Sequence, residues 1–456
     1  MFKKLLIANR GEIAVRIIRA ARELGISTVA VYSEADKESL HTILADEAIC
    51  IGPSRSTDSY LNMNAVLSAA VVTGAQAIHP GFGFLSENSK FATMCEELHI
   101  KFIGPSAAVM DKMGDKINAR AQMLKAGVPV IPGSKGQVTS VDEALEVADA
   151  IGYPIMLKAS AGGGGKGIRK VRQRDELAKA FESASQEAKA AFGNGAMYIE
   201  KVIYPARHIE VQILGDRFGH IIHLGERDCS LQRNNQKVLE ESPSIAIGAT
   251  LRHKIGAAAV RAAQAVGYEN AGTIEFLLDE ASGEFYFMEM NTRVQVEHPV
   301  TEFVTGIDIV KEQIKIAAGQ ALSYQQEDIV LTGHAIECRI NAENPKCHFA
   351  PSPGKITDLY LPSGGVGLRV DSAVYPGYTI PPYYDSMIAK IIVHGSNRFD
   401  ALMKMQRALY ELEIEGVVTN SEFQMDLISD PHVIAGDYDT AFLMETFLPQ
   451  YDKSKD

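Results

Sequence analysis

The sequence lacks the features that mark several protein classes. Its 456 residues include no tryptophan and only five cysteines, which are scattered and form no Cys-x-x-Cys pair. This spacing argues against a structural zinc site and against a disulfide framework, and it makes a reducing cytoplasm the expected compartment. No stretch of about 18 apolar residues occurs, and charges interrupt the short apolar run at the N-terminus. We therefore expect neither a membrane span nor a secretory signal peptide.

Positive charge is also in short supply. Lys and Arg number 45 and Asp and Glu number 57, which gives a net charge of −12 at pH 7. This balance excludes a generally basic surface that would hold nucleic acid, but not a local basic pocket for phosphate. With 46% hydrophobic and 22% charged residues, the composition is typical of a globular protein. The length predicts about three domains, whose cores need neither disulfide nor metal.

The N-terminal third of the chain alternates between two kinds of apolar periodicity. Expected strands cover residues 3–8, 27–32 and 75–78, and expected helices cover 12–24 and 64–73. This alternation predicts a mostly parallel, doubly wound sheet. The first turn contains only Gly11, whereas a dinucleotide-binding fingerprint needs three glycines. We therefore predict Rossmann-like winding without an NAD site.

A glycine cluster, KASAGGGGKG over residues 158–167, interrupts the middle of the chain. The apolar segments that flank it predict strand, glycine loop, strand. Gly167 stands where the phosphate loop of a Walker A motif has Ser or Thr, so that motif is not met. Glycine N–H groups can still approach a phosphate closely, and Lys158 and Lys166 could neutralise the same anion. A flexible hairpin tip is the alternative interpretation.

Polar and apolar residues alternate along residues 284–301, EFYFMEMNTRVQVEHPVT. Period-two alternation predicts an extended strand, because successive side chains of a strand point to opposite faces. One face would then display Glu289, Asn291, Arg293, Gln295 and Glu297. The solvated face of an amphipathic strand is the alternative, but a mixture of carboxylates, amides and a guanidinium is an unusual choice for such a face.

A second carboxylate, Glu275, lies in the apolar stretch GTIEFLL, and a short hairpin would bring it beside Glu289. Buried carboxylates need a partner, and oxygen ligands from Glu275, Glu289 and Asn291 suit Mg²⁺ (or Mn²⁺), which also binds substrate phosphates. With the glycine loop opposite, this arrangement predicts an ATP site without a P-loop. Beyond the metal, Arg293 suits a bidentate oxyanion and Glu297 suits a general base.

Five stretches of the chain, in order, resemble the biotin carboxylase family of the ATP-grasp superfamily. They are IANRGEIAVRIIRA (7–20), HPGFGFLSEN (79–88), KASAGGGGKG (158–167), EMNTRVQVEHPVTE (289–302) and GHAIECRINAE (333–343). The resemblance covers essentially the whole chain. It implies an α/β protein with a Rossmann-like N-terminal domain (1–115), an ATP-grasp domain (116–330) with a mobile lid (about 131–203), a mixed α+β C-terminal domain (331–447) and a tail (448–456).

The resemblance also implies roles for individual residues. The implied ATP-binding residues are Lys116, Lys158, Gly164, Gly165, Glu200, Lys201, Val202, Ile203, His208, Gln232, Glu275 and Glu289. Bicarbonate would be held by Lys237, Arg293, Gln295 and the backbone of Val296, and the implied catalytic residues are Glu297, Arg293, Arg339 and Lys237. Biotin would contact Phe82, Gly83 and Arg339, and the implied metal ligands are Glu275, Glu289 and Asn291.

The implied reaction is the first half-reaction of acetyl-CoA carboxylase in fatty-acid synthesis. Bicarbonate, deprotonated by Glu297, would attack the γ-phosphate of ATP and give ADP and carboxyphosphate, which breaks down to CO2 and phosphate. Phosphate would take the ureido proton of biotin, and Arg339 would stabilise the enolate that attacks CO2. Because water would hydrolyse carboxyphosphate, a lid is expected.

The implied partners are a biotin carboxyl carrier protein, carboxyltransferase subunits and a second copy of the chain in a homodimer. The sequence shows no lysine-bearing biotinyl motif in a small β domain, so biotin is expected to arrive on another chain or segment. Neither nucleic acid nor a membrane is expected as a partner.

Two positions depart from the family pattern. Phe82 stands where Tyr is common, and Asn235, within QRNNQK, replaces a His that is associated with the nucleotide sugar. We expect altered ATP affinity rather than lost chemistry. The alternatives are a subunit of a carboxylase for pyruvate or propionyl-CoA, another ATP-grasp carboxylate–amine ligase, and a non-catalytic nucleotide-binding scaffold. The presence of Glu297 argues against the scaffold.

Overall fold

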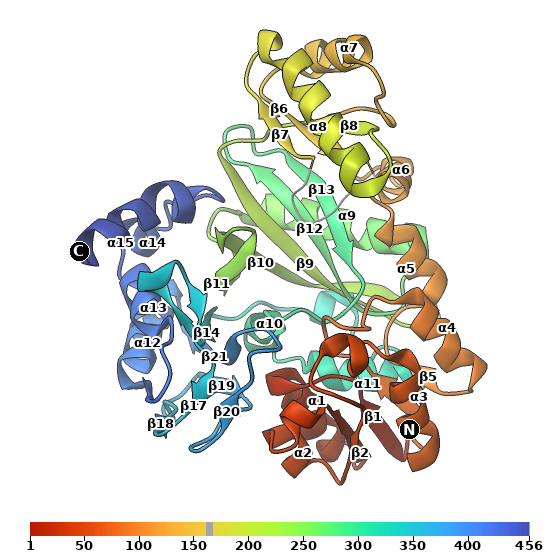
Figure 1. The fold of residues 1–456 in the computed structure, drawn as a ribbon, viewed down its shortest axis with the longest axis vertical. Helices are drawn as coiled ribbons and strands as arrows, with labels where there is room; N and C mark the ends of the chain where they lie inside the picture. Colours follow the sequence, from red (N-terminus) through yellow and green to blue (C-terminus); the bar gives the residue numbers. More distant parts are fainter. Residues whose placement is uncertain (161–166, 456) are drawn as a thin grey trace.

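A parallel sheet organises the N-terminal part of the chain in the computed structural model, which describes residues 1–160 and 167–455 (Figure 1). Its five strands lie in the order β3 (Glu47–Cys50), β2 (Ser27–Tyr32), β1 (Lys4–Ile7), β4 (Ala77–His79), β5 (Lys101–Phe102). All neighbouring strands are parallel. Its helices are α1 (Gly11–Glu23), α2 (Leu40–Leu44), α3 (Met63–Thr73), α4 (Ser89–Glu97) and α5 (Ala107–Gly114). The predicted doubly wound sheet is confirmed, and each predicted element lies within two residues of its expected bounds.

An eight-stranded antiparallel sheet runs through the centre of the molecule. Its order is β13 (Phe285–Asn291), β12 (Asn270–Asp279), β9 (Ala206–Gly215), β10 (Ile221–Arg233), β11 (Gln236–Ser242), β14 (His334–Asn341), β21 (Met387–Gly395), β19 (Leu368–Ser372). β11 pairs with β14, so the sheet continues across the expected domain boundary near residue 331. Three helices belong to this part of the chain: α9 (Ala249–Val266), α10 (His298–Thr305) and α11 (Ile309–Ala317).

Strand β9 shows how the central sheet separates its core from the polar side chains. Ile209, Val211 and Ile213 belong to the same apolar cluster as the buried residues of α9. The intervening side chains, among them His208 and Glu210, are also buried but point to the opposite face, because side chains alternate along a strand. The sheet therefore has an apolar face under α9 and a buried polar face on its other side.

The expected lid region projects from the sheet as a small body of its own, seen at the top of Figure 1. A three-stranded sheet in the order β7 (Arg169–Val171), β6 (Ile155–Ala159), β8 (Met197–Lys201) packs against α7 (Val141–Ile151) and α8 (Leu177–Phe192). Helix α6 (Lys116–Lys125) precedes it. The antiparallel pairing of β6 with β7 confirms the predicted strand–loop–strand pattern. The glycine loop itself, including Gly164, Gly165 and Lys166, lies outside the described residues.

The C-terminal part packs helices against the strands β14, β21 and β19. These helices are α12 (Arg398–Glu411), α13 (Ser421–Ile428), α14 (Pro431–Ala435) and α15 (Leu448–Lys455). Two-stranded ladders join β15 (Glu343–Asn344) to β16 (Ala350–Pro351), β17 (Gly354–Lys355) to β20 (Thr379–Ile380), and β18 (Leu359–Tyr360) to β22 (Glu413–Ile414). Tyr451 is buried in the core of this part, so the chain remains packed beyond residue 447. Within its described residues, no helix has the length and apolar character that a membrane crossing requires.

Candidate active site

Most of the site residues named from the sequence converge on one cavity of about 740 Å³. Those that line it are Phe82, Gly83, His208, Lys237, Glu275, Glu289, Asn291, Arg293, Gln295, Val296, Glu297 and Arg339. They come from the N-terminal part, from the polar face of the central sheet, from the loop after β13 and from β14. The cavity therefore lies where the three parts of the chain meet.

The prediction of one continuous strand through residues 289–297 is wrong. β13 ends at Asn291, and an irregular loop leads from there to α10. The strand stops because β13 is the last strand of the sheet and its pairing with β12 ends at Asn291. Glu87 then takes over as acceptor for the backbone N–H of Thr292 at 2.9 Å. Arg293, Gln295 and Glu297 still reach the cavity, but a loop places them there and not the alternation of side chains along a strand.

The predicted hairpin is confirmed, because Glu275 on β12 and Glu289 on β13 are direct cross-strand neighbours. Burial, and then the negative charge of Glu275, raise the pKa of Glu289. A divalent cation between the two carboxylates would remove this repulsion, and together with Asn291 they offer the oxygen ligands that Mg²⁺ or Mn²⁺ prefers. Glu275 itself accepts hydrogen bonds from Asn291 Nδ2 at 2.8 Å and from Gln295 Nε2 at 2.9 Å. The donor set therefore fits the expected ion.

Lys237 joins three buried carboxylates. Its Nζ lies 2.5 Å from Glu210 Oε2, 3.0 Å from Glu275 Oε1 and 2.6 Å from Glu297 Oε1. Burial alone would lower the pKa of Lys237, but the three carboxylates raise it well above its usual value. The ammonium is therefore charged in this state, and its three donors are directed at the carboxylates of the polar face.

Glu297 lies between two cations. Its Oε1 pairs with Lys237, and its Oε2 accepts a hydrogen bond from Arg339 Nη2 at 3.1 Å. Burial would raise the pKa of this carboxyl, but Lys237 and Arg339, with Arg227, hold it well below its usual range. Glu297 is therefore ionised in this state. Its pKa, and hence its strength as a base, would rise only if Lys237 or Arg339 paired with another anion instead.

Arg339 is also paired from behind, by Glu240 on β11. Arg339 Nε donates to Glu240 Oε1 at 2.6 Å. Burial raises the pKa of Glu240 to about 7, although Arg339 opposes the shift. Its second oxygen has no hydrogen-bond partner in the described part of the chain. Glu240 was not among the residues named from the sequence, and its acidic place in the strand VLEES was the available signal.

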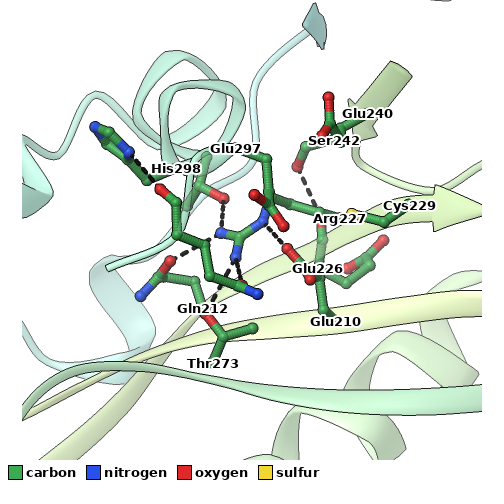
Figure 2. A network of polar contacts seen from close by, with 12 residues as sticks. Glu210, Gln212, Glu226, Arg227, Cys229, Glu240, Ser242, Thr273, Glu297 and His298 are labelled. Carbon is green, nitrogen blue, oxygen red and sulfur yellow. Dashed lines mark hydrogen bonds and ion pairs between the residues drawn. The ribbon is translucent and has the colours of Figure 1, made fainter. Parts of the chain in front are cut away.

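The fully buried Arg227 supports the whole polar face, and sequence reasoning did not identify it. Its guanidinium uses all five donors: it pairs with Glu210 and donates to Gln212 at 2.8 Å, Thr301 at 3.0 Å, Thr273 at 3.1 Å and Gln295 at 2.9 Å. Figure 2 shows it at the centre of side chains that come from several strands and from α10. The signal in the sequence was the charged triplet ERD inside the strand-like run IIHLGERDCSLQ.

The residues expected to hold the nucleotide form two groups. His208 belongs to the part of the molecule outside the lid, called the body below. Its Nε2 lies 3.0 Å from Glu275 Oε2, and its Nδ1 lies 2.6 Å from Gln232 Nε2. The second group lies on the lid and next to it, where Lys158 pairs with Glu200. Of the described residues expected here, those that do not line the cavity are Lys116, Lys158, Glu200, Lys201, Val202, Ile203 and Gln232.

One residue of the lid group has its side chain engaged elsewhere. Lys201 Nζ donates to the carbonyls of Gly152 and Tyr153 at 3.0 and 2.9 Å. This ammonium therefore fastens the end of β8 to the end of α7. The backbone N–H of Lys201 is engaged as well, because it donates to the carbonyl of Pro132 at 2.7 Å.

The structure gives a local reason for one departure from the family pattern. Asn234 and Asn235 form the two-residue turn between β10 and β11, with φ of 51° and 63°. Both central residues of a type I′ turn need this left-handed conformation, which Asn adopts more readily than most residues. Asn235 still lines the cavity, so the exchange for His removes an imidazole but suits the turn.

The expected biotin side is held by backbone contacts. Gly83 has φ of 69°, and Asn9 Nδ2 donates to the carbonyls of Pro80 and Phe82 at 2.7 Å each. Phe82 packs against the apolar core of the N-terminal part. This loop is therefore fixed in place, with Phe82 and Gly83 both facing the cavity.

Comparison with known proteins gives matches along nearly the whole chain. Three family models match: the N-terminal domain of biotin carboxylase over residues 1–110, the ATP-binding domain of the carbamoyl-phosphate synthase L chain over 115–325, and the C-terminal domain of biotin carboxylase over 337–445. Biotin carboxylase 1 of Bacillus subtilis is 59% identical over 447 residues, which cover 98% of this chain and 99% of the relative. A pyruvate carboxylase subunit from Methanothermobacter thermautotrophicus is 54% identical over 98% of this chain and 90% of that relative.

Solved structures agree. A complex of biotin carboxylase from Campylobacter jejuni with a β-γ-ATP ligand superposes with a TM-score of 0.92 at 51% identity, covering 97% of this chain and 98% of that one. The biotin carboxylase domain dimer of Hydrogenobacter thermophilus 2-oxoglutarate carboxylase, in complex with MgADP, ADP and bicarbonate, gives a TM-score of 0.91 at 52% identity, covering 98% of each chain. The chain therefore belongs to the biotin carboxylase family.

Proposed function

We propose that the cavity carboxylates biotin on a carrier protein with bicarbonate and ATP, through carboxyphosphate, and yields carboxybiotin, ADP and phosphate. The observation that supports this function most directly is the ionised Glu297 held between Lys237 and Arg339, next to the paired carboxylates Glu275 and Glu289. A proton acceptor, an anion site and a metal site are thereby within one cavity.

Bicarbonate binds beside Lys237 and Arg293, with Gln295 and the backbone N–H of Val296 as further contacts. Its negative charge draws Lys237 and Arg339 away from Glu297, and the carboxylate then becomes a stronger base. Glu297 takes the proton of bicarbonate, and the freed oxygen attacks the γ-phosphate of ATP. The cations of the cavity offset the negative charge that accumulates on the transferred group.

ATP is held between the lid and the sheet. Its phosphates contact Lys116, Lys158 and the backbone of Gly164 and Gly165, its adenine contacts the segment Glu200, Lys201, Val202 and Ile203, and His208 and Gln232 complete the pocket. Glu275, Glu289 and Asn291 would hold Mg²⁺ or Mn²⁺, which would offset the negative charge of the phosphates and so lower the barrier to phosphoryl transfer. Lys158 leaves Glu200 for the phosphates, so the ion pair seen here is exchanged and not lost.

The second half of the reaction takes place at Arg339. Carboxyphosphate breaks down to CO2 and phosphate, and this phosphate takes the ureido proton of biotin. Arg339 stabilises the enolate oxygen while the ureido nitrogen attacks CO2, and Phe82 and Gly83 contact the biotin ring. Glu240 holds the guanidinium on the other side and thereby fixes the plane in which Arg339 meets the substrate.

The three parts of the chain have separate tasks in this proposal. Residues 1–115 contribute the biotin loop, residues 116–330 bind ATP with 131–203 as the lid, and residues 331–447 supply Arg339, with 448–456 as their C-terminal end. Closure of the lid excludes water from carboxyphosphate. The compact apolar core of the lid supports its movement as a unit.

We also propose the partners expected from the sequence: a biotin carboxyl carrier protein, carboxyltransferase subunits and a second copy of the chain. A face of α12 with exposed Phe399, Met403 and Tyr410 supports the homodimer, because large apolar side chains at helical spacing are a common feature of subunit contacts. All five cysteines are free, which supports a cytoplasmic location. We propose acetyl-CoA as the final acceptor of the carboxyl group.

The decisive experiment measures ADP release with bicarbonate and free biotin, each omitted in turn. We expect release that depends on both and a large loss in Glu297→Gln. Release of AMP, or release driven by an amine, would instead identify a carboxylate–amine ligase, and ATP binding without turnover would identify a scaffold. Adding a biotinylated carrier protein with carboxyltransferases for acetyl-CoA, propionyl-CoA or pyruvate then identifies the acceptor.

A further inference from the structure

We propose that two fully buried side chains, His298 and Lys390, are positioning residues that lock the carbonyls of Gln295 and Val296 and so aim the loop at bicarbonate. Neither side chain lines the cavity. The inference rests on the proposed function, because it concerns the groups that hold and deprotonate the anion. It explains how an irregular loop without strand pairing keeps a fixed conformation.

The first lock is the imidazole of His298, at the start of α10. Its Nδ1 lies 2.7 Å from the carbonyl oxygen of Gln295, and its backbone N–H donates to the same oxygen at 3.3 Å. A carbonyl can only accept, so Nδ1 must carry the proton. Burial, followed by the positive charge of Lys390, holds the pKa of His298 well below its usual value, and the ring is therefore neutral.

The second lock is the ammonium of Lys390, on β21 of the C-terminal part. Its Nζ donates to the carbonyl oxygen of Val296 at 2.7 Å. It lies 3.2 Å from Glu12 on α1 and 3.9 Å from Asp371 on β19, which supply its counter-charge. Lys390 is also the direct cross-strand neighbour of Arg339, so the same pair of strands supplies the lock and the residue proposed to act on biotin.

Locking two successive carbonyls fixes the groups that matter for bicarbonate. A peptide bond is planar and trans, so its N–H points opposite to its carbonyl. Because the Gln295 carbonyl points to the His298 ring, the N–H of Val296 is directed the other way, and Val296 lines the cavity. In the same manner, the bond from Lys390 to the Val296 carbonyl fixes the peptide plane that bears the N–H of Glu297. The N–H of Val296, which is proposed to donate to bicarbonate, and the backbone of Glu297, the proposed base, are thus both held in place by side chains that lie outside the cavity.

A merely structural role for Lys390 is the competing explanation, because removing it leaves Glu12 without its ion-pair partner, whereas Asp371 keeps Arg369. The two explanations differ in which kinetic constants change. If Lys390 positions the loop, its loss affects bicarbonate and spares ATP, because the residues proposed to bind ATP lie on other elements. If it only balances charge, its loss lowers stability and leaves the bicarbonate constants of the folded protein unchanged.

The test compares full-length variants in the ADP-release assay, with kcat and KM measured separately for bicarbonate, ATP and biotin. For Lys390→Met and His298→Leu we expect kcat/KM for bicarbonate to fall about 10- to 100-fold, since a displacement of about 1 Å has such an effect. The KM for ATP stays within about twofold of the wild-type value. His298→Asn, whose Nδ2 can replace the ring Nδ1 as donor, should recover most of the loss.

The matched control is Lys404→Met. Lys404 Nζ also donates to a carbonyl, that of His394 at the far end of β21, at 2.9 Å. This variant loses a lysine–carbonyl hydrogen bond far from the loop, so its bicarbonate constants should not change. An equal loss of kcat/KM for bicarbonate in Lys404→Met and Lys390→Met would overturn the proposal.

The double variant Lys390→Met with Glu12→Gln separates position from charge. It removes the carboxylate that would be left unpaired, so the melting temperature should return toward the wild-type value while kcat/KM for bicarbonate stays low. Recovery of the bicarbonate constants would show that charge balance was the only role of Lys390. A crystal structure of Lys390→Met gives a readout independent of activity: an unchanged Val296 peptide would overturn the inference. By contrast, a wild-type protein that needs no bicarbonate would overturn the proposed function and, with it, the role of the loop toward bicarbonate, while the structure of Lys390→Met would still decide whether Lys390 fixes the Val296 peptide.

Discussion

The cavity in the body and the lid above it pair charges in opposite ways. In the body, Arg227 is fully buried with every donor satisfied, and Lys237 contacts three carboxylates. On the lid, the side chain of Lys158 remains 40% exposed, and its one ion pair with the described residues is with Glu200. A buried network of many short polar contacts holds its side chains in one arrangement, whereas a single partly exposed ion pair can exchange partners at a small cost in free energy. The charged side chains of the body are therefore fixed by their own contacts, whereas Lys158 is free to exchange Glu200 for the phosphates in the proposed mechanism.

The largest effect that would sharpen this comparison is expected at Glu297. We expect Glu297→Gln to lower kcat by about 10²- to 10⁴-fold, because the amide cannot accept the proton of bicarbonate. The measurement is bicarbonate-dependent ADP release, with ATP binding as the control that the lid still responds. Turnover at the wild-type rate would remove Glu297 from the mechanism.

A comparable loss, but of stability, is expected at Arg227. Arg227→Met leaves Glu210 buried without its guanidinium, and removal of one partner of a buried ion pair costs about 3–5 kcal/mol. Urea unfolding monitored in the body and in the lid should show a lower midpoint in the body alone. Equal loss of stability in the body and in the lid would show that the two parts unfold together, and the two could then not be compared by their stability.

Acid should also act on the body first. Burial lowers the pKa of His41 to about 4 and that of His79 to about 3, whereas residues 131–203 contain no histidine. Above pH 6.5 both histidines are neutral in the folded and unfolded states. As the pH falls from 6.5 to about 4, the unfolded chain takes up the protons first, and His41 alone costs about 3 kcal/mol of the stability of the body. Hydrogen exchange, corrected for intrinsic rates, should show amides of the N-terminal sheet losing protection before those of the lid.

A smaller effect is expected at Lys158. We expect Lys158→Met to raise the KM for ATP about tenfold, since a hydrogen bond to a charged group contributes about 1.5–3 kcal/mol. The melting temperature should remain within about 1 °C, because the pair is partly exposed, with 40% of the Lys158 side chain and 16% of the Glu200 side chain accessible. A clear fall in melting temperature without a change in the KM for ATP would show that the pair of Lys158 with Glu200 stabilises the fold and does not bind ATP. The lid would then not differ from the body in this respect.

The smallest effect is expected at the surface of the lid. Arg174→Met breaks the pair with Asp149, in which the two side chains are 64% and 43% exposed. Such pairs contribute about 0–1 kcal/mol, so neither lid stability nor ATP affinity should change measurably. A loss of stability as large as that of Arg227→Met would show that the exposure of an ion pair does not determine how much it stabilises the body or the lid.

The sequence predicted those features that depend on local periodicity or on short hairpins. It placed three strands of the N-terminal sheet, β1, β2 and β4, from their local pattern. It also predicted the pairing of Glu275 with Glu289, because a hairpin brings near neighbours in sequence together. It did not identify Glu240, Arg227 or Lys390, which make contacts with residues far away along the chain, such as Glu240 with Arg339 and Lys390 with Glu12. It also extended β13 too far, because a period-two pattern cannot show where pairing with the neighbouring strand β12 stops.

The continuity of the sheet across residue 331 sets a limit on the chemistry of the cavity. Lys237 and Arg339 lie on β11 and β14, which are hydrogen-bonded neighbours, and adjacent strands stand about 4.8 Å apart. In the proposed mechanism, the donor and the recipient of the one-carbon unit are thus mounted on the same rigid frame. Opening of the lid can admit or release nucleotide, but it cannot lengthen the path that CO2 travels.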